Sequence, residues 1–170
     1  ISTFKSITAF TGLRALFFVM FAYQIAFFVY PSVWAYFTSE RFDWSPQYVG
    51  LSLTVFGISM AVTQGLLMRP ILTRFGEEKT AIYSLLIGAV SLGGIAFVPH
   101  GWLLISLTPL AALGVIASPA LMGIMSREVS DQHQGELQGL INSTNSIALL
   151  LSPLLMTQIF SYFSADSAPI

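Results

Sequence analysis

The stretch that decides the fold runs from Pro119 to Pro153 and reads PALMGIMSREVSDQHQGELQGLINSTNSIALLLSP. It holds two apolar runs joined by one short polar link, residues 126–134. The second run opens with small and polar residues at helical spacing: Gly135, Gly139, Asn142, Ser143 and Ser146. A stripe of this kind on an apolar helix suits close packing in lipid or a wet pathway. The stretch therefore predicts two membrane-spanning helices and the link between them.

The composition of the whole chain agrees with this prediction. Of 170 residues, 55% are hydrophobic and 9% are charged, whereas a soluble domain carries about 25% charged residues. The chain has no cysteine, which excludes disulfides, thiol catalysis and Cys-based metal sites. No basic stripe for nucleic acid and no catalytic or metal-binding constellation is found, so we expect no enzyme, no metal and no cofactor. The composition predicts an all-α integral membrane protein.

Five segments are apolar and long enough to cross about 30 Å of hydrocarbon, which takes roughly 20 residues. They are residues 15–38, 49–68, 81–98, 102–125 and 137–163. Ser45 and Pro46 predict a helix N-cap followed by proline at the first helical position. Because the span count is odd and the chain starts at Ile1, we expect a fragment of a longer protein, a partial helical bundle.

The basic residues predict the orientation of these spans. If the polar segments are assigned to alternating sides, one side holds Lys5, Arg14, Arg69, Arg74, Lys79 and Arg127, and the other holds Arg41 alone. Lysine and arginine accumulate on the cytoplasmic side of membrane proteins. We therefore predict that the N-terminus of this chain is cytoplasmic and that its C-terminus lies outside.

Polar side chains within the spans are the candidate pathway residues. A polar group in hydrocarbon needs a partner, so it faces protein or water. The candidates are Gln24, Tyr30, Trp34, Gln64, Ser118, Asn142, Asn145 and Ser146. We predict that they line a cavity for a small organic molecule. The alternative is that they join helices by hydrogen bonds.

A second set of residues is assigned to helix packing and bending. Gly57, Ala61 and Gly65 share one helix face, and small residues at this spacing let two backbones approach closely. Gly135 and Gly139 are expected to do the same on the fifth span. Prolines predict kinks in the last two spans, and Pro119 and Pro153 are the expected hinges.

The acidic residues are informative by their position. None of the eight lies inside a predicted span. Proton relays in pumps use carboxylates or histidines within the membrane. If the whole protein is proton-coupled, we expect its titrating group outside this stretch.

Four parts of the sequence resemble a known family. Residues 69–79, RPILTRFGEEK, resemble a degenerate cytoplasmic loop motif of the major facilitator superfamily, with Arg74, Gly76 and Lys79 in place and Thr73 at its acidic position. Three further stretches resemble the tetracycline-resistance class of drug/proton antiporters. They are Pro31 to Trp44, Val49 to Gln64 and Pro119 to Leu155.

The resemblance implies helices seven to eleven of a twelve-helix major facilitator fold. It implies a secondary transporter of a bacterial-type inner membrane. Such a transporter would export a small organic compound in exchange for protons, by alternating access. Its partners would be the substrate, membrane lipid and the missing N-terminal half. Among the family's functional positions Gln64 matches, Gln24 is out of register by one residue, and Ala89 stands where the family has an aspartate. The alternative function is a non-transporting membrane scaffold or sensor.

Overall fold

The computed structural model describes residues 11–165, except the side chains of residues 11, 29, 30, 160 and 163–165. Every regular element in this range is helical, which confirms the predicted all-α class. The elements are α2 (Thr11–Phe42), α3 (Pro46–Val62), η1 (Thr63–Leu67), α4 (Met68–Phe97), α5 (Gly101–Leu113), η2 (Gly114–Ile116), α6 (Ala117–Arg127), η3 (Asp131–His133) and α7 (Gln134–Ala165).

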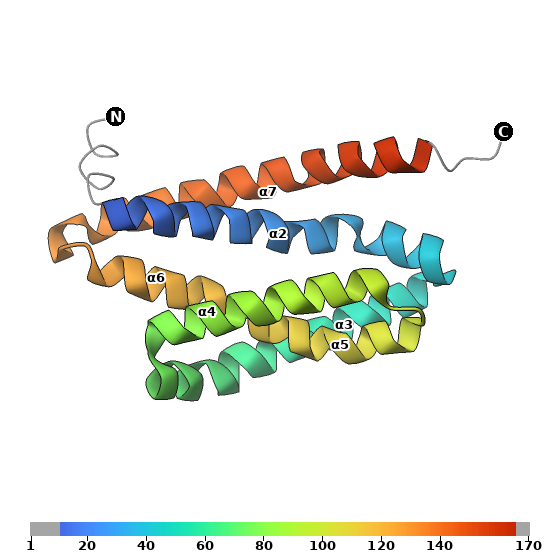
Figure 1. The fold of residues 1–170 in the computed structure, drawn as a ribbon, viewed down its shortest axis with the longest axis horizontal. Coiled ribbons are helices and arrows are strands. Elements are labelled where there is room, and N and C mark those ends of the chain that lie inside the picture. The colour runs from blue at the N-terminus through green and yellow to red at the C-terminus, as the bar shows by residue number, and fades with distance from the viewer. Residues whose placement is uncertain (1–10, 166–170) are drawn as a thin grey trace. The chain divides into compact units, whose positions relative to one another are not determined.

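These helices form two compact units. One unit contains α2 up to Phe37 together with η3 and α7, and the other is Thr38–Glu128. In the first unit α2 and α7 lie side by side and run in the same direction (Figure 1). In the second, α3, α4, α5 and α6 pack through a shared core.

Three helical stretches are long and apolar enough to cross a membrane. They are Pro46–Phe97, Gly101–Arg127 and Asp131–Ile159, and α2 is a fourth if its two segments, Gly12–Phe28 and Pro31–Phe42, are counted as one bent span. The first stretch has 52 residues and contains two of the predicted spans, 49–68 and 81–98. The division into five crossings stays a prediction.

The break inside that long stretch falls at Gly76. Its φ of 76° and ψ of 168° are non-helical, while the residues on both sides are helical. The sequence predicts a polar turn over residues 69–79, and the structure confines the turn to this one position. A positive φ favours glycine because it has no Cβ to clash. The chain reverses there, so the longer part of α4 runs back beside α3 (Figure 1).

Two irregular helical turns each end three residues before a proline. The π-helical turn η1 precedes Pro70, and the 3₁₀ turn η2 precedes Pro119. Proline has no N–H for the carbonyl four residues back, and its ring collides with that carbonyl. The carbonyls concerned belong to Leu66 in η1 and Val115 in η2. In contrast, α7 stays helical through Pro153.

The start of α3 confirms the predicted signal, because Ser45 is the N-cap and Pro46 the first helical residue. The segment before it is tied to the end of α4. Arg41 donates from Nη2 to the Val98 carbonyl at 3.4 Å, which satisfies a backbone acceptor at a helix C-terminus. The lone basic residue on its predicted side of the membrane therefore has a structural role.

One close backbone contact between helices uses glycines outside the predicted packing set. A Cβ added to Gly114 would lie 2.9 Å from the Gly88 Cα, so η2 and α4 touch backbone to backbone. In contrast, Gly57 and Gly65 have nothing within 4 Å of an added Cβ, and Ala61 is exposed. Within residues 11–165, no helix packs closely on the predicted face. Whether a helix elsewhere in the protein covers it stays a prediction.

We expect Gly114→Ala to lower the free energy of unfolding by about 1–3 kcal/mol, because the new methyl group would force two backbones apart. Thermal or denaturant unfolding of the full-length protein in detergent would measure it. Gly88→Ala is the matched control, since its Cβ would make an ordinary 3.7 Å contact. Equal effects of the two substitutions would contradict the assigned packing.

Candidate functional site

An amide–amide hydrogen bond joins two of the predicted pathway residues. Gln24 of α2 donates from Nε2 to Oδ1 of Asn145 in α7 at 2.6 Å, across 121 positions of sequence. Gln24 is buried and Asn145 half-buried. A polar pair within an apolar helix bundle satisfies groups that lipid cannot. The structure therefore brings Gln24 and Asn145 together and fixes their side chains.

A second polar contact joins the same two helices. The buried Ser152 hydroxyl lies 2.7 Å from the Ala148 carbonyl in its own helix and 3.2 Å from the Ile25 carbonyl of α2. Its single proton is shared between these two acceptors. With the amide pair, this contact ties α2 to α7 at two levels along α7.

The exposed polar stripe of α7 lies beside the amide pair. Asn142, Ser143 and Ser146 are all exposed. The Ser143 hydroxyl donates to the Gly139 carbonyl at 2.8 Å, and the Ser146 hydroxyl donates to the Asn142 carbonyl at 2.9 Å. Their protons are thus used within the helix, whereas their oxygens can still accept hydrogen bonds. Gly135 and Gly139 have no neighbour within 4 Å of an added Cβ, so this face is open among the described residues.

A groove of about 480 Å³ lies between the N-terminal parts of α2 and α7. Its α2 wall consists of Arg14, Phe17, Phe18 and Phe21, and its α7 wall includes Leu140 and Ile147. The volume falls in the range of small-molecule sites, about 300–1,000 Å³. The sequence does not reveal this groove, because Arg14 and the phenylalanines lie more than a hundred residues from the opposite wall.

The remaining pathway candidates have separate surroundings. Trp34 is buried, and its ring lies 6.4 Å from that of Phe37. The side chain of Tyr30 lies outside the described residues. Gln64 and Ser118 belong to the other unit. Gln64 is exposed within the π-helical turn η1, and Ser118 is half-buried in the first turn of α6.

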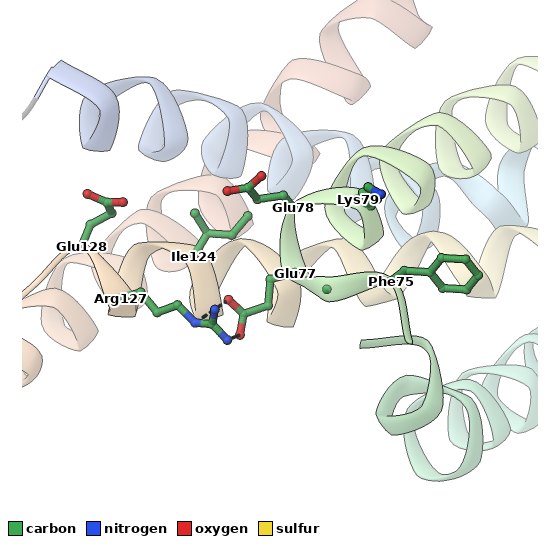
Figure 2. Close-up of a pocket in the computed structure, with 8 residues that line it drawn as sticks. Phe75, Glu77, Glu78, Lys79, Ile124, Arg127 and Glu128 are labelled. Carbon is green, nitrogen blue, oxygen red and sulfur yellow. Dashed lines mark hydrogen bonds and ion pairs between the residues drawn. The ribbon is translucent and has the colours of Figure 1, made fainter. Parts of the chain in front are cut away.

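The loop motif forms a charged cluster with the end of α6. Arg127 contacts both carboxylate oxygens of Glu77, each at 3.1 Å. Figure 2 shows the guanidinium of Arg127 reaching the carboxylate of Glu77, with Phe75 and Lys79 on the other side of Glu77. A Cβ on Gly123 would lie 2.7 Å from that carboxylate, so the glycine leaves space for it. The sequence places Glu77 in a charged link but does not identify Arg127, 50 positions away, as its partner.

Arg69, Arg74 and Lys79, the other charged members of the predicted motif, are exposed. Over residues 11–165, no group of three or more histidine, aspartate or glutamate side chains is placed to hold a metal ion. The polar chemistry that the structure gathers is therefore of two kinds. One is the neutral amide and hydroxyl set on α2 and α7, and the other is the ion pair between α4 and α6.

Long apolar helices with a few satisfied polar groups define a multi-pass helical membrane protein. Residues 16–169 match the family model of the Major Facilitator Superfamily. The chain belongs to this superfamily, whose members are membrane transporters.

Several tetracycline resistance proteins are similar to this chain. The class C protein of Escherichia coli is 36% identical over 161 residues, which are 95% of this chain and 41% of the relative. The class G protein of Vibrio anguillarum is 33% identical over 153 residues (90% and 39%), and the class B protein of Escherichia coli is 33% identical over 156 residues (92% and 39%). The chain thus spans about two fifths of these relatives. No solved structure matches it.

The ion pair between α4 and α6 makes a prediction for stability. We expect Arg127→Glu to lower the melting temperature of the full-length protein in detergent, because it places a carboxylate against Glu77. The double exchange Glu77→Arg with Arg127→Glu should recover most of this loss. The Arg127 side chain is 77% exposed, so the coupling energy should stay below about 1 kcal/mol. Strictly additive losses in the double variant would show that the two groups do not interact.

Proposed function

We propose that the protein containing this chain is a secondary transporter that exports a small organic compound in exchange for protons. Membership of the superfamily supports a transporter, and the names of the similar proteins, which describe resistance to tetracycline, support export of a drug-like compound. The described helices carry polar chemistry suited to hydrogen bonding and none suited to catalysis. Transport is therefore favoured over an enzymatic function.

The chain would supply helices seven to eleven of a twelve-helix fold. Its α2 would be helix seven, and α7 would be helix eleven. The N-terminal half of the same protein would complete the pathway, and the two halves would rock against each other around a site near the middle of the bilayer. Membrane lipid would surround the remaining faces.

The observation that carries the proposal is the Gln24–Asn145 bond beside the open stripe of α7. Two amides and two serines on adjacent turns are more than packing between two helices requires. Asn145 keeps both N–H donors for a second partner, because it acts only as an acceptor toward Gln24. Gln64 adds support, since π-helical turns within α-helices are frequent at functional sites.

The coupling proton would be carried elsewhere. None of the eight acidic residues lies within the predicted spans, and Ala89, at the position of the family's aspartate, is an exposed methyl side chain on α4. A proton relay needs a group that titrates. We therefore place the titrating residue in the part of the protein outside this chain.

The membrane would be the inner membrane of a bacterium, with residue 11 on the cytoplasmic side and residue 165 on the outside. The asymmetry of six basic residues against one supports this orientation. The parallel course of α2 and α7 agrees with it, because both helices begin after segments assigned to the cytoplasmic side.

We expect Asn142→Ala, Asn145→Ala and Gln64→Ala each to lower transport by roughly two- to tenfold, the value of one neutral hydrogen bond. The measurement is tetracycline uptake into inverted vesicles containing the full-length protein, with and without a pH gradient. Gln158→Ala removes an exposed amide at the far end of α7 and is the matched control. Membrane insertion should be normal in all four variants. Unchanged transport in the three site variants would reject the assigned site.

A further inference from the structure

The groove between α2 and α7 has a chemical character of its own. Phe17, Phe18 and Phe21 line its α2 wall, and Leu140 and Ile147 line its α7 wall. Thr144, the one hydroxyl in the lining, donates to the Leu140 carbonyl at 2.8 Å. The walls are therefore apolar and rich in aromatic faces, which suits a flat apolar ligand.

The groove has a single charge at one end. Arg14 is exposed, and it is the only ionisable group in the lining. Among the residues that the structure describes, it contacts no carboxylate, and the one ion pair found there is that of Arg127 with Glu77. An unpaired guanidinium beside an apolar groove favours a ligand that brings its own anion, such as a carboxylate or sulfonate.

The amide pair lies beyond the opposite end of the groove, because neither Gln24 nor Asn145 lines it. Gln24 lies one helical turn beyond Phe21, and Asn145 follows Thr144 directly. From Arg14 to Phe21, the α2 wall of the groove, the helix rises about 10 Å, the length of two to three fused rings.

We propose that this groove binds aromatic organic anions, with the anionic group at Arg14 and the rings between the phenylalanines and the apolar wall of α7. This inference rests on the proposed export function and names the substrate class. A cationic substrate would find no carboxylate in the lining, whereas an anion meets Arg14. A substrate of this class would differ from any compound that a transporter recognises through a buried carboxylate.

The test uses two probes that share one fluorophore and differ in charge. Dansylglycine is an aromatic anion, and dansylcadaverine is the corresponding cation. Full-length protein in phosphatidylcholine nanodiscs is titrated with each probe, and dansyl fluorescence reports binding. We expect dansylglycine to bind about three- to fivefold more tightly, the effect of a contact with one exposed charge.

Variants assign the binding to the groove. Arg14→Gln should weaken dansylglycine binding about three- to fivefold, and Arg14→Lys should restore part of it. Thr144→Phe should block the groove sterically while keeping Arg14. Arg41→Gln removes a distant guanidinium and should leave binding unchanged. Melting temperatures of all variants show whether each remains folded. Equal binding of the two probes, or unchanged binding in Arg14→Gln and Thr144→Phe, would overturn the proposal.

Two further arms separate the possible outcomes. If phosphatidylglycerol in the nanodisc displaces dansylglycine, the groove is a lipid site and the proposal is overturned. Uptake of dansylglycine into energised inverted vesicles tests transport separately. Binding without uptake would support the groove but oppose export. Tetracycline uptake without dansylglycine binding would leave the export function intact and overturn the substrate class.

Discussion

Hydrocarbon offers no hydrogen-bond partner, and this constraint explains most of the polar contacts in the described structure. Gln24 and Asn145 satisfy each other across two helices. The hydroxyls of Ser143, Ser146 and Ser152 return to carbonyls of their own helix. Irregular turns occur where Pro70 and Pro119 leave carbonyls without a donor. Exposed polar groups that remain open after this accounting, such as the Asn142 side chain, are the ones that a pathway can use.

The sequence predicts local features of the fold well. The length of apolar runs predicts the helices, Ser45 and Pro46 predict the start of α3, and the charged link at residues 69–79 predicts the turn that the structure places at Gly76. These features depend on neighbouring residues or on a single backbone conformation, so they can be inferred from short segments. The sequence also identifies Gln24 and Asn145 as candidate pathway residues, because an amide side chain is costly in lipid.

Pairings between distant segments are not predictable in the same way. Several helices carry small residues, and the sequence favours Gly57, Ala61 and Gly65, whereas the backbone contact between described helices is at Gly88 and Gly114. The partners in the Gln24–Asn145 and Glu77–Arg127 pairs lie 121 and 50 positions apart. Only the arrangement of helices within each unit identifies them. The groove at Arg14 is equally hard to predict from the sequence, because its two walls come from opposite ends of the chain.

The account's central claim is that the open stripe of α7 lines a water-filled pathway. Since this chain has no cysteine, Asn142→Cys and Ser146→Cys can be introduced into a full-length protein freed of any other cysteine. Labelling with the membrane-impermeant reagent sulfonatoethyl methanethiosulfonate would then measure access to water. Val90→Cys, at an exposed apolar position of α4, is the control for a lipid-facing site. The account predicts rapid labelling at residues 142 and 146 and none at residue 90. Labelling at residue 90 with none at residues 142 and 146 would contradict it.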